Sequence, residues 1–251
     1  MHIRIFSIDQ MNKIKKIVKS INLIDNNQEA IACKKNIEDL RLRMEGSKTT
    51  IAVVDYGAVS PLLDNSIGNS DDYRVTFKTI GDICKRASAK RERDMILYNL
   101  IRCMKPKICL ELGTCLGISA CYQGLALKFN QSGTLVTLEG SKILASIAID
   151  NVKSLGLDNV TVLVGKFYET MPQALLHYNP VDFAFIDGHH EENATIKYWQ
   201  MLLPFLSDNA VIVFDDIRWS SGMTRAWKHI KKNKKIDSAL VAKGMGICLL
   251  K

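Results

Sequence analysis

The chain has 251 residues, of which 47% are hydrophobic and 24% charged, a composition typical of a soluble globular protein with room for one large domain and an appendage. No uninterrupted apolar run approaches the roughly 18 residues of a membrane span, and we expect no secretory signal at the N-terminus. The seven cysteines form no CxxC pair. We therefore expect reduced thiols in a cytoplasmic protein.

The formal net charge is +8, which would suit binding to nucleic acid or another anion. Much of this charge is local, because residues 225–235 carry six lysines and arginines and no acidic residue. Their helical spacing favours one solvated helix end, where cations also suit the negative end of the helix dipole. A nucleic-acid surface is the less favoured interpretation.

The first hundred residues carry mixed patterns. Helices are predicted over 10–24 and 28–45, a short strand over 50–57, a loop or lid rich in Gly, Ser, Asn, Asp and Pro over 55–72, and a helical pattern again near 75–104. We interpret residues 1–104 as an N-terminal helical extension with a substrate-side loop. In one interpretation Asp55 or Tyr56 touches a substrate; in the other, this is a packed entry segment. The first helices pack on the domain or on a second subunit of a homodimer.

From residue 107 the pattern alternates regularly. Strands are predicted at 107–112, 134–139, 159–164, 181–186 and 209–214, and helices at 117–130, 141–156, 168–178, 191–206 and 220–233. Such alternation is typical of parallel βαβ units with right-handed crossovers. Residues 238–251 indicate a terminal hairpin. The predicted fold is α/β, with a Rossmann-like seven-stranded, mostly parallel sheet, an antiparallel last strand and helices on both faces.

A glycine turn follows the first of these strands. An apolar run ends in Glu111, and Gly113 and Gly117 come before a helical segment. The glycines let a ligand approach the backbone closely, and the free N–H groups of a helix start attract negative charge. The spacing is not G-x-G-x-x-G, which disfavours a dinucleotide oxidoreductase.

Polar groups also follow each of the four remaining parallel strands of the predicted sheet. These are Glu139, then 165–167, then 187–190, then 215–219. Ligands of open α/β sheets lie beyond the carboxyl ends of the strands. Five such strand ends at one edge predict a binding site there.

Three motifs in order carry a family resemblance. They are residues 110–119 (LELGTCLGIS), 185–190 (FIDGHH) and 214–222 (FDDIRWSSG). The sequence over 107–251 resembles the class I S-adenosylmethionine-dependent methyltransferases, and more narrowly the O-methyltransferases related to catechol and caffeoyl-CoA O-methyltransferase. The resemblance implies an S-adenosylmethionine-binding domain over 105–251 that methylates a small molecule.

The resemblance also implies a cofactor-binding set. Glu111 would attract the ammonium and sulfonium side of the cofactor. Backbone N–H groups near Gly113, Thr114 and Gly117, with the Ser119 hydroxyl, would bind its carboxylate.

Three further residues complete that set. Glu139 would accept hydrogen bonds from both ribose hydroxyls. Phe167 would stack on adenine or serve as a core aromatic residue, with neither interpretation favoured. Asp187 is assigned both to the cofactor and to catalysis.

Relatives of the catechol type bind a divalent cation through aspartates at the places of Asp187, Asp215 and Asp216. These oxygen ligands suit Mg²⁺ or another divalent cation. The family's general base is a lysine, and His190 stands at its position. A histidine there can accept a proton near neutral pH, bind a metal or only hydrogen bond. His189 is assigned a structural role.

Two other functions stay open. The charge allows an RNA methyltransferase, although the sequence lacks an Asn-Pro-Pro-Tyr-type motif and an aromatic-basic surface stretch. A non-catalytic module would bind S-adenosylmethionine without transferring its methyl group.

Overall fold

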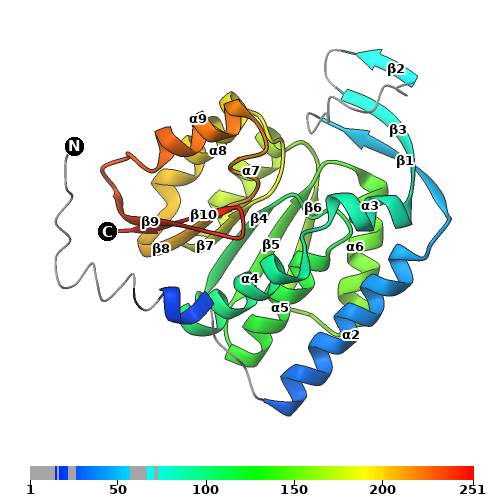
Figure 1. The fold of residues 1–251 in the computed structure, drawn as a ribbon, viewed down its shortest axis with the longest axis horizontal. Helices are drawn as coiled ribbons and strands as arrows, with labels where there is room; N and C mark the ends of the chain where they lie inside the picture. The colour runs from blue at the N-terminus through cyan, green and yellow to red at the C-terminus, as the bar shows by residue number, and fades with distance from the viewer. Residues whose placement is uncertain (1–14, 16, 22–26, 57–66, 71–72) are drawn as a thin grey trace.

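The computed structural model describes residues 15, 17–21, 27–56, 67–70 and 73–251. A seven-stranded sheet in the order β6-β5-β4-β7-β8-β10-β9 forms its centre (Figure 1). The strands are β4 (Ile108–Leu112), β5 (Thr134–Glu139), β6 (Val160–Val164), β7 (Val181–Ile186), β8 (Leu206–Phe214), β9 (Ile236–Ala242) and β10 (Met245–Leu250). The strands β4 to β8 pair in parallel, and β10 is antiparallel to both of its neighbours. The predicted α/β fold, with its antiparallel last strand, is confirmed.

Helices cover both faces of the sheet (Figure 1). One face packs against α2 (Gln28–Glu45), α4 (Arg91–Met104), α5 (Ile118–Asn130) and α6 (Lys142–Ser154), and the other against α7 (Phe167–His177), α8 (Glu192–Leu202) and α9 (Ser221–Ile230). Successive strand residues divide between the two apolar clusters: Cys109 belongs to the first and Leu110 to the second. This division follows from the two-residue period of a strand, and it explains why strands buried on both faces are continuous apolar runs.

The order of the strands reverses beside β4. From β4 the chain moves outward through β5 to β6, and then returns to place β7 on the other side of β4. In open α/β sheets this reversal leaves a crevice at the carboxyl ends of the two central strands. The fold therefore brings the residues after β4 and β7 together.

The N-terminal region differs from its prediction in its strands. Residues 75–79, predicted as the start of a helix over 75–104, belong to β3 (Tyr73–Thr79), which pairs with β1 (Thr50–Asp55) and β2 (Ile67–Ser70) in a separate small sheet. The rest of that predicted helix is two helices, α3 (Ile80–Ala87) and α4. The strand at 50–57 and the helix at 28–45 are confirmed as β1 and α2.

The remaining N-terminal predictions fall partly outside the described residues. Of the helix predicted over 10–24, Lys15 and residues 17–21 are described and are helical. Of the loop predicted over 55–72, the described residues 67–70 belong to β2. In the described part of the chain, no helix is long and apolar enough to cross a membrane.

Candidate active site at the carboxyl edge of the sheet

The glycine turn after β4 is built so that only glycine fits its first position. Gly113 has φ +100°, and a Cβ there would clash with the carbonyl oxygen of Asp187 at the end of β7. Gly117 has φ +81°, and a Cβ there would lie 3.0 Å from the Cβ of Ala148 in α6. Both residues adopt a backbone conformation that side chains disfavour, and both lie against another element. The turn therefore closes tightly on the central strands.

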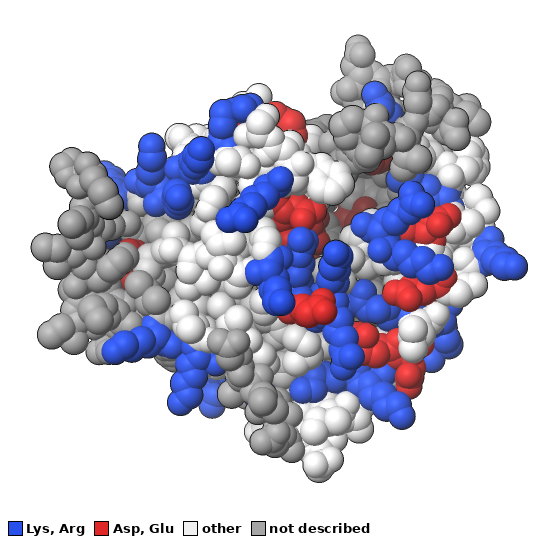
Figure 2. All heavy atoms as spheres, viewed as in Figure 1, with Lys and Arg blue, Asp and Glu red and all other residues white. Residues whose placement is uncertain are grey.

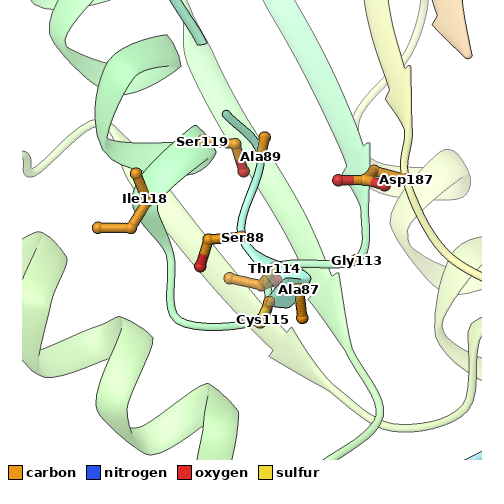
Figure 3. Close-up of a pocket in the computed structure, with 9 residues that line it drawn as sticks. All are labelled: Ala87, Ser88, Ala89, Gly113, Thr114, Cys115, Ile118, Ser119 and Asp187. Atoms are coloured by element: carbon orange, nitrogen blue, oxygen red, sulfur yellow. The ribbon is translucent and has the colours of Figure 1, made fainter. Parts of the chain in front are cut away.

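A small, shallow hollow lies over this turn. Figure 3 shows the linker between α3 and α4, Ala87–Ser88–Ala89, crossing beside the turn, with Asp187 on the opposite wall. Thr114, Cys115, Ile118 and Ser119 contribute to the lining. The linker was not singled out in the sequence, because nothing in its three small residues marks a binding segment.

Glu111 lies beneath the turn. The carboxylate is fully buried, and it accepts hydrogen bonds from Ser119 Oγ (2.7 Å), Gln123 Nε2 (2.6 Å) and Thr137 Oγ1 (2.5 Å). Burial raises the pKa of Glu111 to about 7, against the opposing effect of these hydrogen bonds. The side chain exposes no atom in this arrangement, and its direct contact with a cofactor stays a prediction. Its partners show that it supports the start of α5 from below.

Glu139, at the end of β5, reaches the same turn. Its two oxygens accept one backbone N–H each, from Cys115 (2.8 Å) and Ser141 (2.8 Å), and the residue is 9% exposed. Burial raises the pKa of Glu139. A carboxylate has about four acceptor positions, so these two bonds leave capacity for ligand hydroxyls.

The backbone donors of the turn are already used within the chain. The N–H groups of Gly113 and Thr114 bond to the Leu138 carbonyl (3.0 and 3.2 Å), and that of Gly117 bonds to the Thr114 carbonyl (2.8 Å). The binding of a ligand carboxylate by N–H groups near Gly113 to Gly117 stays a prediction, and these three N–H groups already have acceptors within the chain. The first bond within α5 runs from Cys121 to Gly117, and Gly117 supplies no side-chain cap. The N–H groups of the first turn of α5 are the donors that helix geometry leaves open to an anion.

Aromatic side chains lie beyond Glu139. The ring of Tyr56, just after β1, lies so close to Gly140 that a Cβ there would be 2.7 Å from it. The ammonium of Lys166 is 5.2 Å from the centre of the same ring. Phe167 packs instead against Gly188 and edge-on to Tyr198, at 5.7 Å between ring centres. This packing is that of the core aromatic residue considered for Phe167, whereas the Tyr56 ring lies against Gly140, the residue after Glu139.

The two histidines after β7 have different surroundings. The Nδ1 atom of His189 lies 3.0 Å from the hydroxyl of Tyr198, and burial lowers the pKa of His189. This is the structural role assigned to it. The Nε2 atom of His190 lies 3.6 Å from Oδ1 of Asp187, and its ring is 6.3 Å from that of Trp219. His190 and Asp187 are thus adjacent at the mouth of the crevice.

The three aspartates assigned to a metal lie close together, but an arginine lies among them. Arg93, in the first turn of α4, places Nη1 2.6 and 2.7 Å from the two oxygens of Asp215 and 2.9 Å from Oδ1 of Asp216. Burial, followed by the charges of Asp215 and Asp216, raises the pKa of Asp187 well above its usual range. On the face shown in Figure 2, acidic side chains lie at the centre with lysine and arginine side chains around them.

This donor set does not fit a divalent cation. A metal ligated by Asp215 and Asp216 would need the oxygens that the guanidinium of Arg93 already holds. Among the described residues, no group of three or more His, Cys, Asp or Glu side chains is arranged to hold a metal ion. The metal assignment stays a prediction, which the present contacts of Asp215 and Asp216 with Arg93 oppose.

Arg93 is the site residue that sequence reasoning missed. One signal was present: Lys90, Arg91 and Arg93 are cations at the start of a helix, where the dipole disfavours them. A cation at such a place needs a partner, and for Arg93 the partner lies more than a hundred residues away in the sequence.

Comparison with known proteins indicates a methyltransferase domain. Residues 110–217 match the model of a methyltransferase domain family. An O-methyltransferase from Bacillus cereus in complex with S-adenosylhomocysteine is 25% identical, with a TM-score of 0.58 over 66% of this chain and 84% of that one.

Two other solved structures show the likeness of the fold. A Podospora anserina methyltransferase bound to S-adenosylhomocysteine is 17% identical, with a TM-score of 0.61, covering 100% of this chain and 99% of that one. An O-methyltransferase from Streptomyces achromogenes in complex with S-adenosylmethionine is 21% identical, with a TM-score of 0.57 over 66% of this chain and 82% of that one.

Proposed function

We propose that this chain is an S-adenosylmethionine-dependent methyltransferase that transfers the methyl group to a hydroxyl oxygen of a small molecule. The match of residues 110–217 to a methyltransferase domain and the likeness to the Bacillus cereus O-methyltransferase support this. One observation carries the proposal most strongly. The open N–H groups of α5, the carboxylate of Glu139 and the His190–Asp187 pair lie along one edge of the sheet, around the crevice between β4 and β7.

The chemistry of these groups matches the parts of the cofactor. The start of α5 suits its carboxylate, because backbone N–H groups and the helix dipole both favour an anion. The remaining acceptor positions of Glu139 suit the two ribose hydroxyls. Tyr56, beside Gly140, is the aromatic side chain that we assign to this end of the cofactor in place of Phe167.

When bound, the cofactor would supply a methyl group on a positively charged sulfur. As the acceptor oxygen bonds to the methyl carbon, the carbon–sulfur bond would break and the sulfur would leave as a neutral thioether. The chain's main contribution is to hold the acceptor in line with that methyl group. Nδ1 of His190 accepts the proton that the hydroxyl loses, because Nε2 faces Asp187. Oδ1 of Asp187 lies 3.6 Å from Nε2, where it orients the ring and stabilises its protonated form.

The O-methyltransferases from Bacillus cereus and Streptomyces achromogenes support oxygen as the acceptor atom. We assign residues 105–251 to the cofactor and residues 1–104 mainly to the acceptor side. Tyr56 and Ala87–Ala89 are the exceptions, because they lie at the cofactor end, beside Gly140 and over the glycine turn.

Calorimetric titration with S-adenosylhomocysteine tests the cofactor site. The wild type should bind, and Glu139→Ala should bind about tenfold more weakly or worse, because hydrogen bonds to a charged acceptor are lost. Asp158→Ala is the matched control: Asp158 is an exposed carboxylate just before β6, at the opposite edge of the sheet, and its loss should not change affinity. No binding by the folded wild type would sink the proposal.

Turnover separates the remaining alternatives. A screen of phenols, sugar hydroxyls and carboxylates with labelled cofactor should find methyl transfer to one class, with the rate falling in His190→Ala. Cofactor binding without turnover on any acceptor would favour the non-catalytic module. Binding to RNA that falls steeply with salt, together with RNA methylation, would favour the RNA methyltransferase.

A further inference from the structure

The guanidinium of Arg93 occupies a defined position between two carboxylates. Nη1 lies within 2.6–2.9 Å of three carboxylate oxygens, two from Asp215 and one from Asp216. The side chain of Asp215 is 3% exposed and that of Arg93 is 19% exposed. These are short, charge-assisted hydrogen bonds in a largely water-excluded place.

Three separate parts of the chain hold this arrangement. Arg93 comes from α4, and its Nε donates to the carbonyl of Lys243 (3.1 Å) in the turn between β9 and β10. In the same turn, a Cβ at Gly244 would lie 3.1 Å from Nη2. Asp216 has φ 47°, an uncommon conformation for a residue with a side chain, and its N–H bonds to Oδ1 of Asp215 (2.8 Å). Such over-determined positions are typical of functional sites.

This arrangement competes directly with a metal ion. Mg²⁺ requires oxygens at about 2.0–2.1 Å in near-ideal octahedral geometry. Nη1 already hydrogen bonds to both oxygens of Asp215 and one of Asp216, and a second cation among them would be repelled. An arginine keeps its charge throughout the accessible pH range, so protonation equilibria do not empty the position.

We propose that Arg93 is a built-in cation that replaces a divalent metal at the acceptor site: it neutralises Asp215 and Asp216, holds them in position and keeps metal ions out. Arg93 is thus a positioning residue, and it orients the acceptor through the two carboxylates. The placing of the acceptor rests on the proposed function, whereas the exclusion of metal does not depend on it.

Titration with Mn²⁺, followed by electron paramagnetic resonance and calorimetry, tests this directly. The wild type should show no Mn²⁺ site that depends on Asp215. Arg93→Ala should bind Mn²⁺ at least about tenfold more tightly than the wild type, because it leaves two carboxylates without their cation. Arg93→Ala combined with Asp215→Asn should lose the gained site. A loss of structure alone would not create a metal site that disappears with one carboxylate.

Two further variants complete the experiment. Arg91→Ala removes an exposed cation from the same helical turn and should bind Mn²⁺ as weakly as the wild type. Arg93→Met keeps more of the side-chain packing and should gain the same site if Arg93→Ala unfolds. S-adenosylhomocysteine titration on the same samples reports the cofactor site separately, so a failure of the proposed function is distinguishable. Mn²⁺ binding by the wild type that Asp215→Asn abolishes would overturn the proposal, as would folded Arg93 variants that gain no site.

Discussion

Glu111 shows how a residue at a predicted position acquires a different role. Its place before the glycine turn follows from the sequence, but its partners Gln123 and Thr137 come from a helix and a strand further along the chain. Sequence spacing gave no indication that both would surround the carboxylate. Together they enclose a carboxylate whose ionised form the folded protein disfavours.

The raised pKa of Glu111 makes stability depend on pH. The folded protein holds the proton up to about pH 7, whereas the unfolded chain releases it near pH 4.5. Stability from this group is therefore fully present below about pH 4.5 and is lost as pH rises through 7, in total about 3 kcal/mol. In Glu111→Gln this part of the pH dependence should vanish, because an amide does not titrate. The variant should still fold, because Thr137 can accept from the amide and donate to Thr114.

Urea unfolding of the wild type and Glu111→Gln at pH 5 and pH 8 measures the effect. The difference in unfolding free energy between the two proteins should shift by about 2.5 kcal/mol between these pH values, in favour of the variant at pH 8. Glu169→Gln, which removes an exposed carboxylate on α7, is the control for the loss of one charge. Parallel curves for the wild type and Glu111→Gln would contradict the prediction.

Gly113 is the second residue with a specific consequence. Gly113→Ala should destabilise the protein by at least about 2 kcal/mol and abolish S-adenosylhomocysteine binding, because the new Cβ would clash with the Asp187 carbonyl and the φ of +100° is strained. Gly46→Ala is the matched control, since Gly46 has nothing closer than 3.6 Å to a new Cβ. Thermal unfolding and calorimetry should separate the two variants, and equal behaviour would contradict this explanation of the turn.

At the scale of elements, α2 is tied to the active-site edge by one buried ion pair. Arg41 of α2 pairs with Asp94 of α4, and it donates to the carbonyl of Ala89 (2.9 Å) in the linker over the hollow. Asp94 is fully buried, and burial raises its pKa well above the usual range despite the arginine. The helix therefore holds both α4 and the linker.

Removing one partner of this pair should be costly. Arg41→Ala should destabilise the protein by about 3–5 kcal/mol, because it leaves the Asp94 carboxylate buried and unpaired. Arg43→Ala, an exposed arginine on the same helix, should change stability by less than about 0.5 kcal/mol. Denaturant midpoints measure both variants. A loss below about 1 kcal/mol in Arg41→Ala would show that Asp94 finds another partner or is protonated at little cost.

The elements of the main sheet were predictable, and β3 was not. Strands buried on both faces give continuous apolar runs, which is why β5 and β7 match their predicted bounds. In β3, Tyr73, Val75 and Phe77 alternate with polar residues, and this two-residue period was the available signal. Because a helical pattern begins directly after Thr79, the two-residue period of this short strand is difficult to separate from it. The strand also belongs to a small sheet whose partners no local pattern indicates.

At the scale of the whole molecule, the site is predictable to the extent that the topology builds it. Glu139, Asp187, Asp215 and His190 lie at one edge because parallel strands with right-handed crossovers all end there. Arg93 comes from outside these repeated units, and its position depends on how α4 packs on α5 and reaches the C-terminal hairpin. The electrostatic character of the acceptor site thus depends on tertiary packing, which the motifs do not encode.

The insertion of β10 between β8 and β9 couples completion of the site to the docking of the last hairpin. The Lys243 carbonyl, in the turn of that hairpin, accepts a hydrogen bond from Arg93, whose guanidinium also binds Asp215 just after β8. The charged cluster is therefore complete only when the hairpin is docked on the sheet, whichever part of the chain folds first.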